Sequence, residues 1–413
     1  MRILIIGLNY APEAIGIAVY TSGLAEALTG PGNRIEVIAG RPYYPDWRSW
    51  SGYSRWWYSS RMEKGVKVIR CPHYVPAKPS GPRRILHHAS FALTSLFPSL
   101  WCALRSRPQL VLVVAPSLIA APIGALAALV AGAKSWLHVQ DLEVDAALAT
   151  GLVGPGAGGR FAHAFERWVL RLFGRVSSIS EQMCSRIAAK GVPVDRVSEL
   201  RNWADVDEIR PIAGESRYRA EWEIKRPHVA LYAGNIANKQ GIEIVIEAAR
   251  RLAARSDLIF VICGQGPNRS KLEQQASDLD NVLFRDLQPR DRLADLLGLA
   301  TVHLLPQLAS AADLVLPSKL GNMLASGRPV VATAGTGTGL ERAVKDCGFI
   351  TEPENGRTFA DAIERLVDDE PLRAQLGRNA RLRAESSLSR GAIVGAFASD
   401  LARYCSPSRG GKS

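Results

Sequence analysis

A serine and a lysine at the start of a short predicted helix are the first residues whose types and spacing indicate chemistry. Ser318 occupies an N-cap position, and Lys319 begins a helix that we expect to run to Ser326. Gly327 suits a left-handed helix end, and Pro329 blocks continuation. Because the first amides of a helix lack partners within it and a lysine adds a full charge, the stretch predicts a phosphate seat. An ordinary capped surface helix is the alternative.

A second lysine with the same potential lies in the stretch YAGNIANKQG, from Tyr232 to Gly241, which joins a predicted strand to a helix. Lys239 stands at the start of that helix, where it could neutralise a diphosphate, and Asn235 could donate a hydrogen bond to the same group. Gly234 would let the backbone approach the ligand, because it has no side chain. A solvated lysine at a helix terminus is the alternative.

Two further glycine-containing loops follow predicted strands. The segment GLNYAPEAIG, from Gly7 to Gly16, leads into a helix, and Gly264 and Gly266 form a tight turn after a later strand. A side chain at such places would block the approach of the backbone to a phosphate or sugar. The first segment is not GxGxxG, and no acidic residue closes the next strand, so the pattern disfavours a dinucleotide-dependent dehydrogenase.

Acidic residues and one histidine gather at the end of another predicted strand. By alternation along the strand, His138 and Gln140 share a face, with Asp141 at its mouth. His138 could act as a base, although the pattern is more typical of a satisfied core histidine. Glu143–Asp145 and Asp205–Asp207 both have the DxD spacing by which some sugar transferases hold a metal, but the second pair lies in a predicted linker. We find no Ser-His-Asp set in the sequence and predict no metal site.

Alternating strands and helices would position all of these residues. Short apolar runs are separated by stretches long enough for crossover helices, which predicts parallel sheets with helices on both faces. In such folds ligands bind at the carboxyl ends of the strands. The predicted strands are Ile3–Ile6, Ile35–Ala39, Val66–Arg70, Leu110–Val114, Ser135–Val139, Val176–Ser180, Val229–Tyr232, Leu258–Cys263, Val282–Arg285, Val302–Leu305 and Val330–Ala332.

The length of 413 residues predicts two domains. We expect an α/β protein of two Rossmann-like doubly wound sheets facing across a cleft, with the polar segment Leu200–Ser216 between them and the last helix returning to the first domain. The predicted bounds are 1–200 for the first domain, 201–216 for the hinge, 217–385 for the second domain, 386–405 for the crossover helix and 406–413 for a disordered tail.

The composition, 47% hydrophobic and 22% charged residues, is that of a globular chain. Six cysteines without a CxxC pair indicate neither a disulfide framework nor a zinc site, so we expect a reducing cytoplasm. The apolar start of the chain is too short for a signal peptide. The uncharged segment Leu110–Ala133 could span a bilayer, but Pro116, Ser117 and Pro122 interrupt it, which favours a strand, a turn and a buried helix.

Positive charge and aromatic residues concentrate in the first third of the chain. The net charge is +12, and residues 1–140 hold fifteen Lys and Arg against five Asp and Glu. No acidic residue occurs from Pro72 to Gln140, so we expect an anionic partner. A helix beginning near Arg83 and Arg84 would carry the apolar stripe Ile85, Ala89, Leu93, Leu96, Leu100 and Leu104, typical of an interfacial helix, with core packing as the alternative.

Four tryptophans lie close together just before this helix, and they resemble a membrane interface belt. They are Trp47, Trp50, Trp56 and Trp57. Acceptor binding or packing of the loop is the alternative. Arg and Trp together could also bind single-stranded nucleic acid, but no nucleic-acid module accompanies them, so we predict no such partner.

Several motifs in order resemble one family over roughly residues 1 to 400. The chain is similar to the retaining glycosyltransferases of GT-B fold, family 4, in particular the group of colanic acid biosynthesis glycosyltransferases. The stretches that carry the resemblance are NYAPEAIGIAVYT, RPYYPDW, VIRCPHYVP, HVQDLEVDAA, SISEQM, RNWADVD, YAGNIANKQGIE and DLVLPSKLGNMLASGRPVVAT.

The resemblance implies transfer of a sugar, with retained configuration and without a metal or other cofactor, from a nucleotide diphosphate to a polyprenyl-diphosphate-linked saccharide. The enzyme would build an exopolysaccharide or capsule unit as a peripheral protein on the inner face of the plasma membrane. The predicted catalytic residues are Lys239, which the resemblance implies, and Asp141 and His138, which are predicted from their place at the end of a strand. The implied donor-binding residues are Gly16, Gly234, Asn235, Lys239, Gly264, Asp313, Ser318, Lys319, Leu320 and Asn322. The acceptor or membrane residues would be Trp47, Trp50, Trp56, Trp57, Arg83 and Arg84.

Two departures from the family pattern concern the donor site. Asn235 stands where many members have arginine, and Leu314 and Asn322 stand where paired glutamates often frame the phosphate-binding helix. Asn322 could hold the ribose as a neutral donor and acceptor, and Asp313 could replace the first glutamate. The alternatives to a transferase are a nucleotide-sugar epimerase on the same scaffold, which needs no lipid acceptor, and a lipid-binding or nucleic-acid-binding module without catalysis.

Overall fold

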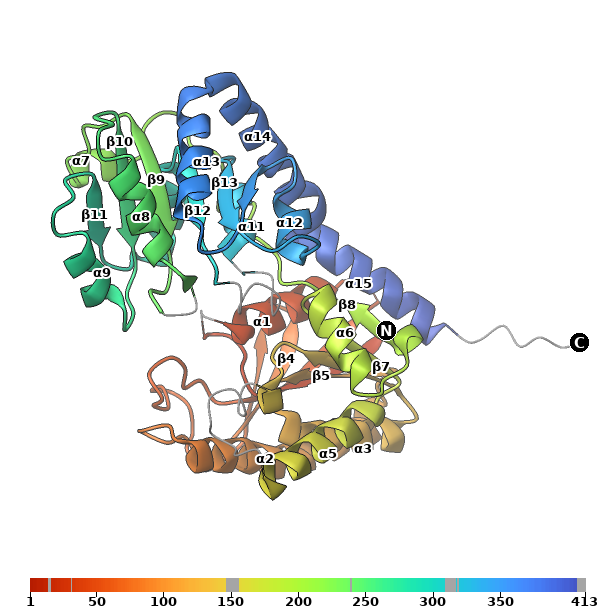
Figure 1. Cartoon of the computed structure of the whole chain (residues 1–413). Coiled ribbons are helices and arrows are strands. Elements are labelled where there is room, and N and C mark those ends of the chain that lie inside the picture. Colours follow the sequence, from red (N-terminus) through yellow and green to blue (C-terminus); the bar gives the residue numbers. More distant parts are fainter. Residues whose placement is uncertain are drawn as a thin grey trace, which may run out of the picture. The chain divides into compact units, whose positions relative to one another are not determined.

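The computed structural model describes residues 1–13, 16–30, 32–145, 156–237, 240–308, 317 and 319–406 (Figure 1). The chain forms two compact units, which are described separately below. Unit 1 comprises Met1–Arg201 and Val394–Ser413, and unit 2 comprises Asn202–Ile393. Among the described helices, none combines the length and the apolar character that crossing a bilayer requires.

Unit 1 is built on an eight-stranded sheet of order β3-β4-β2-β1-β5-β6-β7-β8, in which only the β3–β4 pair is antiparallel. Without β3, the order is that of a doubly wound fold, because the direction of the strand order reverses between the neighbours β1 and β5. Apolar runs buried on both faces explain the parallel strands. The strands are β1 Arg2–Gly7, β2 Arg34–Gly40, β3 Ser59–Glu63, β4 Val66–Cys71, β5 Leu110–Ala115, β6 Lys134–Val139, β7 Arg175–Ser178 and β8 Val197–Glu199.

The helices of unit 1 cover both faces of its sheet. Figure 1 shows α2, α3 and α5 along one face, with α1 and α6 on the other. The segment Leu110–Ala133 folds as β5, a short 3₁₀ turn and α3, so the prediction of strand, turn and helix is confirmed. The expectation of a buried helix is wrong for one side of α3, because Leu126, Leu129 and Val130 are exposed. The helices are α1 Ile17–Leu28, α2 Gly81–Ser106, α3 Ala121–Ala131, α5 Ala157–Arg171 and α6 Glu181–Ala189.

The last helix, α15 (Arg390–Cys405), contributes its second half to unit 1. The rings of Phe397 and Tyr404 lie 5.0 and 5.8 Å from the ring of Trp136 on β6, both edge-on. The side chains of Lys134 and Arg175 lie over the Tyr404 ring. Residues from the two ends of the chain therefore complete one hydrophobic unit.

Unit 2 has a fully parallel six-stranded sheet of order β11-β10-β9-β12-β13-β14. Numbered within the unit this is 3-2-1-4-5-6, so the strand order reverses between β9 and β12. The strands are β9 His228–Ala233, β10 Leu258–Cys263, β11 Val282–Arg285, β12 Val302–Leu305, β13 Val330–Thr333 and β14 Gly348–Thr351. The helices are α7 Tyr218–Glu221, α8 Glu243–Arg251, α9 Arg269–Gln275, α10 Leu293–Gly298, α11 Lys319–Ala325, α12 Gly339–Val344, α13 Gly356–Asp368 and α14 Glu370–Arg383, followed by a π-helical turn at Ala384–Leu388.

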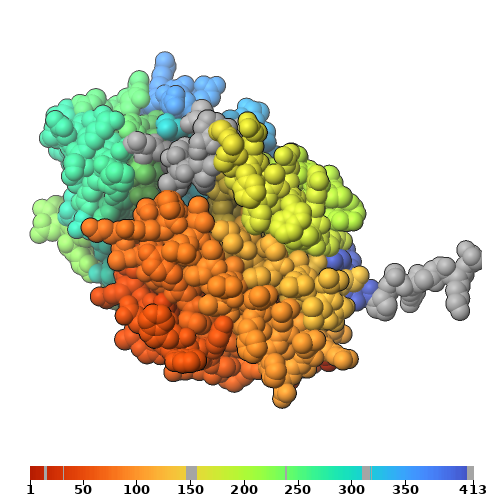
Figure 2. Space-filling model, turned by 90° about the horizontal axis from the view of Figure 1, so that it is seen from below, coloured from red at the N-terminus to blue at the C-terminus, as the bar shows by residue number. Residues whose placement is uncertain are grey.

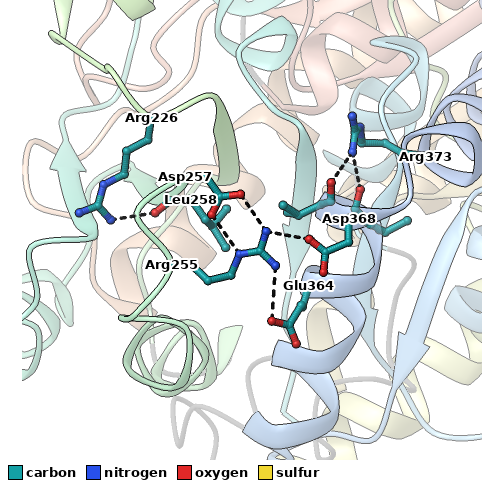
Figure 3. Close-up of polar contacts among 9 residues, drawn as sticks. Arg226, Arg255, Asp257, Leu258, Glu364, Asp368 and Arg373 are labelled. Carbon is teal, nitrogen blue, oxygen red and sulfur yellow. Dashed lines mark hydrogen bonds and ion pairs between the residues drawn. The ribbon is translucent and has the colours of Figure 1, made fainter.

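An ion-pair network centred on Arg255 ties α13 to the amino end of the unit 2 sheet (Figure 3). Its guanidinium binds Asp257 with two hydrogen bonds of 3.0 and 2.8 Å, and it pairs with Asp368 at 2.7 Å and with Glu364 at 3.4 Å. Hydrogen bonds to Arg255 lower the pKa of both aspartates. The network stabilises the sheet at the end of the strands opposite the ligand-binding end.

Candidate functional site

The candidate site of unit 2 lies at the carboxyl ends of β9, β10 and β12. Parallel α/β sheets bind ligands where the strand order reverses, which in this sheet is between β9 and β12. The loop after β9 begins at Gly234, the loop after β10 begins at Gly264, and α11 begins at Lys319. The fold therefore brings together three of the segments that the sequence predicted as ligand contacts.

The two glycine loops after β9 and β10 lie in backbone contact. A Cβ atom at Gly264 would lie 1.8 Å from the carbonyl oxygen of Gly234, and one at Gly266 would lie 2.1 Å from the oxygen of Ile236. The amide of Ile236 donates to the oxygen of Gln265 at 2.8 Å. Only glycine fits at these two positions, so the loops form one rigid ledge whose shape depends on both of them.

Lys319, the first residue of α11, places its charged side chain beside Gly234 of this ledge. Its Nζ atom lies 4.0 Å from the centroid of the Tyr232 ring, and a Cβ at Gly234 would come within 3.3 Å of it. In the described part of the chain, no carboxylate pairs with this ammonium. Burial lowers the pKa of Lys319 to about 8, because the ammonium loses water without gaining a counter-charge. An anion bound beside it would supply the missing partner.

The helix that carries Lys319 agrees with its prediction to within one residue. It ends at Ala325, and Gly327 has the expected left-handed backbone with φ of 69°. The amide of Leu320 donates to the oxygen of Pro317 at 3.0 Å, and the Leu320 side chain is fully buried. Its role as a donor-binding residue stays a prediction, and neither its amide nor its side chain is free in this structure.

Two asparagines predicted for the donor site have defined surroundings. Asn235 is exposed, and its carbonyl oxygen accepts a hydrogen bond of 2.6 Å from the Tyr232 hydroxyl. Asn322 is half-buried and accepts the amide of Asp205 through Oδ1 at 3.2 Å. Asp205 also pairs with Arg290, which fits its interpretation as a linker residue. The remaining predicted donor residues of unit 2, Lys239, Asp313 and Ser318, lie outside the described residues.

In unit 1, a buried carboxylate organises the loops after β1 and β2. Glu13 is 3% exposed, and its Oε1 accepts the amides of Tyr43 and Tyr44 at 2.8 and 2.9 Å. Its Oε2 accepts from Asn9 at 2.9 Å. Burial raises the pKa of Glu13. The sequence did not predict a role for Glu13, although the stretches NYAPEAIGIAVYT and RPYYPDW, which contain Glu13 and its partners, carry the family resemblance.

Gly16, the predicted site glycine of unit 1, begins α1 with φ of 65°. No atom lies within 4 Å of a Cβ built there, so backbone conformation and not crowding requires glycine in this structure. Its contact with a donor stays a prediction.

His138 near the end of β6 and the acidic residues that follow this strand have different surroundings. His138 is buried, and its Nδ1 lies 3.0 Å from the hydroxyl of Ser177, which also accepts from Trp136. Burial lowers the pKa of His138 to about 4, as is typical of a core histidine. Its catalytic role stays a prediction, as does that of the exposed Asp141. Glu143 accepts the amide of Leu118 at 3.0 Å, and burial raises its pKa to about 8.

Asp145 belongs to a cluster with His163 and Glu166 whose ligand atoms all lie within 4.8 Å of one another. A lysine already supplies the positive charge there, since Nζ of Lys190 lies 2.7 Å from Asp145 and also binds Glu166. The cluster is an ion-pair network in which Lys190, just after α6, joins Asp145 to Glu166 on α5. The expectation of a metal-free enzyme remains an expectation.

The predicted tryptophan belt divides into packed and exposed parts. Trp47 packs against Tyr43 and His87 beneath Arg84, and the indole nitrogen of Trp50 is buried. Trp56 and Trp57 are exposed, by 82% and 76%. Trp47 and Trp50 thus contribute to the packing of the loop, which was the alternative to a membrane interface belt.

Helix α2 presents an apolar surface outward, which we call the α2 face. It consists of Ile85, Leu86, Leu93, Phe97, Trp101 and Leu104, all more than half exposed. The core alternative for the predicted stripe is therefore wrong for Ile85, Leu93 and Leu104. The Phe97 ring stacks on Trp101 and lies 6.5 Å from Tyr58. Figure 2 shows the side of unit 1 on which α2, in orange, lies beside the paler α3.

The two doubly wound sheets, with glycine loops and a lysine at the carboxyl ends of the second, are those of a protein of GT-B fold. Residues 16–203 match the model of the glycosyl transferase 4-like domain, and residues 215–383 match that of glycosyl transferases group 1. The chain is 39% identical over 412 residues to WcaI of Escherichia coli (strain K12), assigned as a colanic acid biosynthesis glycosyl transferase; this match covers 97% of the chain and 100% of WcaI. The chain therefore belongs to the family 4 glycosyltransferases.

Solved structures share the fold at low sequence identity. Sucrose-phosphate synthase of Thermosynechococcus elongatus aligns with a TM-score of 0.72 and 18% identity, over 98% of each chain. HepE of Anabaena, solved in complex with UDP, aligns with a TM-score of 0.69 and 15% identity, over 98% of this chain and 100% of HepE. These likenesses establish the GT-B fold of the chain.

Proposed function

We propose that the enzyme transfers a sugar from a nucleotide diphosphate donor to a lipid-linked saccharide during synthesis of a colanic acid-like exopolysaccharide. The observation that carries the donor half is the ammonium of Lys319 beside the glycine loops of unit 2, which has no carboxylate partner among the described residues. The relation to WcaI supports the pathway, and the UDP bound in HepE supports a nucleotide ligand.

The chemistry follows from charge. As the bond between the sugar and the diphosphate breaks, negative charge grows on the leaving phosphate. A cation held in place beforehand stabilises that charge without the reorganisation that water would need. Lys319 would supply the cation, Lys239 would add a second, and the glycine loops would let the backbone come close. We propose retention of configuration and no requirement for a metal.

Comparison of two lysine variants tests the donor half. Lys319→Ala should reduce nucleotide release from the preferred donor by 10²-fold or more, on the order expected for loss of one preorganised group at a developing charge. Lys225→Ala, which removes an exposed lysine of the same unit, is the matched control. Both variants are assayed against UDP-, GDP- and dTDP-sugars. Equal turnover by Lys319→Ala and the wild type would contradict the assignment.

Product analysis without an acceptor distinguishes the proposal from its alternatives. Slow release of free sugar and nucleoside diphosphate is expected of a transferase, because water replaces the acceptor. Conversion of the donor to an isomeric nucleotide sugar would identify an epimerase. Binding without any turnover, also when extracted lipid-linked saccharides are added, would identify a binding module.

For the acceptor half, we propose that the α2 face docks on an anionic lipid surface at the inner side of the plasma membrane, where polyprenyl-diphosphate-linked saccharides reside. Trp101 and Phe97 provide large apolar area, and Arg105 lies over the Trp101 ring at 6.0 Å. Arg83 and Arg84 begin the helix, and α2 carries no acidic residue. Amphipathic helices of this charge and shape bind anionic membranes in the interfacial plane.

Vesicle sedimentation tests this half. The wild type should sediment with vesicles of phosphatidylglycerol and phosphatidylcholine, and less so at high salt, because screening weakens the contribution of the arginines. The double variant Phe97→Ser, Trp101→Ser should lose most of the bound fraction. Leu382→Ser, which alters an equally exposed apolar residue of α14, is the control. If the double variant and the control bind alike, the α2 face is not the docking surface.

A further inference from the structure

The side chain beneath Lys319 makes two contacts in the donor site. Tyr232 is the fifth residue of β9, and its ring is fully buried in the unit 2 core. One face of the ring lies 4.0 Å from Nζ of Lys319. Its hydroxyl donates to the carbonyl oxygen of Asn235 at 2.6 Å. One residue therefore contacts both the cation and the glycine loop of the ledge.

The ring is a suitable support for an ammonium that has no carboxylate partner among the described residues. The π face of an aromatic ring attracts a cation, and the attraction is larger where water is excluded. A carboxylate in the same place would hold the lysine more strongly, but it would compete with the phosphate for the charge. The ring instead fixes the position of Nζ and leaves its charge available to an incoming anion.

Burial of Tyr232 makes this support rigid. The ring lies in the apolar cluster that includes Ile236 and Phe260. The hydrogen bond to Asn235 fixes the tip of the same ring and the course of the loop. A lysine side chain has many rotamers, so a fixed contact near its end reduces the freedom that donor binding must otherwise restrict.

We propose that Tyr232 is a positioning residue for the diphosphate of the donor: its ring holds the Lys319 ammonium beside Gly234, and its hydroxyl holds the loop that carries Asn235. This inference rests on the proposed donor site and adds a residue to it. Two substitutions separate the two functions of this side chain. Tyr232→Phe keeps the ring and loses the hydroxyl, whereas Tyr232→Leu loses both.

The test compares affinities for UDP, GDP and ADP with those for the matching nucleosides, by calorimetric titration. Tyr232→Leu should weaken binding of the preferred nucleoside diphosphate about three- to thirtyfold, the range for a partly desolvated cation–π contact, and leave the nucleoside affinity nearly unchanged. Tyr232→Phe should keep most of the preference for the diphosphate. Phe260→Leu, a change in the same core on the neighbouring strand, should lower thermal stability without altering that preference.

A double-mutant cycle separates positioning from general stability. In a Lys319→Met background, Tyr232→Leu should cause little further loss of diphosphate affinity, because the two side chains act together. Tyr232→Met, whose longer and more flexible side chain can fill more of the space of the ring, serves if Tyr232→Leu does not fold. Additive losses in the cycle would overturn the inference, as would parallel losses of nucleoside and diphosphate binding.

The outcomes distinguish this inference from the proposed function. If Lys319→Met abolishes the diphosphate preference while Tyr232→Leu retains it, the donor site stands and the role of Tyr232 is refuted. If the wild type binds none of the three diphosphates more tightly than their nucleosides, the donor site itself is refuted, and the inference fails with it.

Discussion

Replacement of Lys319 by methionine should stabilise the nucleotide-free protein at neutral pH. The pKa of this lysine falls from 10.5 to about 8 in the folded chain, because burial removes water from the ammonium. A lowering of the pKa from 10.5 to about 8 corresponds to roughly 3 kcal/mol of unfolding free energy. Lys319 keeps some solvent contact, which reduces the cost to about 1–2 kcal/mol. Methionine has similar length and no charge, so it removes this cost.

The sign of the pH dependence follows from linkage. Below pH 8 the folded protein carries the charged lysine at its full cost. Between pH 8 and 10.5 the folded state releases the proton while the unfolded state still binds it, so the unfolding free energy of the wild type rises with pH. The advantage of Lys319→Met should therefore be complete at pH 7 and nearly absent above pH 10.5.

Thermal unfolding at pH 7 and at pH 10.5, without nucleotide, measures this difference. A gain of 1–2 kcal/mol raises the midpoint by about 2–8 °C for a domain of this size. Lys225→Met, at an exposed site of the same unit, is the control and should show no pH-dependent gain. The reasoning is refuted if Lys319→Met is no more stable than the wild type at pH 7, or if its advantage is the same at both pH values.

Three further predictions concern packing, ion pairs and burial. Gly264→Ala should lower the unfolding free energy of unit 2 by about 3 kcal/mol or more and weaken nucleotide binding, because its Cβ would overlap a backbone oxygen. Denaturant unfolding measures this loss. Gly335→Ala is the control, because a Cβ at Gly335 would make only one ordinary contact. Arg255→Ala should cost about 1–2 kcal/mol, less at high salt, and leave nucleotide affinity unchanged in titration. The unfolding free energy of the wild type should fall as the pH is lowered from 6.5 to 4, because His138 binds a proton in the unfolded chain but, with a pKa of about 4, not in the folded chain. His138→Phe should reduce this dependence of the unfolding free energy on pH.

Short apolar runs and the lengths of the segments between them were sufficient to predict most strands of the two sheets. Every strand predicted from an apolar run is present, and β10, β11 and β12 have the predicted bounds. The strands that were missed, β3, β8 and β14, are short edge or near-edge strands whose sequences, such as SSRME in β3, contain few apolar residues. Edge strands are stabilised by pairing with a neighbour, which local composition does not reveal.

The candidate site was predictable only where glycine or charge marked it. Gly264 and Lys319 were found because a glycine after a strand and a lysine at a helix start are local signals. Glu13 and Tyr232 were missed, because the importance of each depends on partners that are distant in sequence or that face them only after folding. The burial of the Leu320 side chain in the core was likewise not predicted, because it depends on how α11 packs on the sheet.

The position of α15 has a consequence for how the chain is made. Phe397 and Tyr404 cover Trp136 on β6, so unit 1 needs residues that the ribosome adds only after all of unit 2. Until α15 has been synthesised, the nascent amino-terminal unit must leave that indole uncovered. A truncation within the second half of α15 would therefore damage the first unit of the enzyme more than the second, although the missing residues follow the second in the sequence.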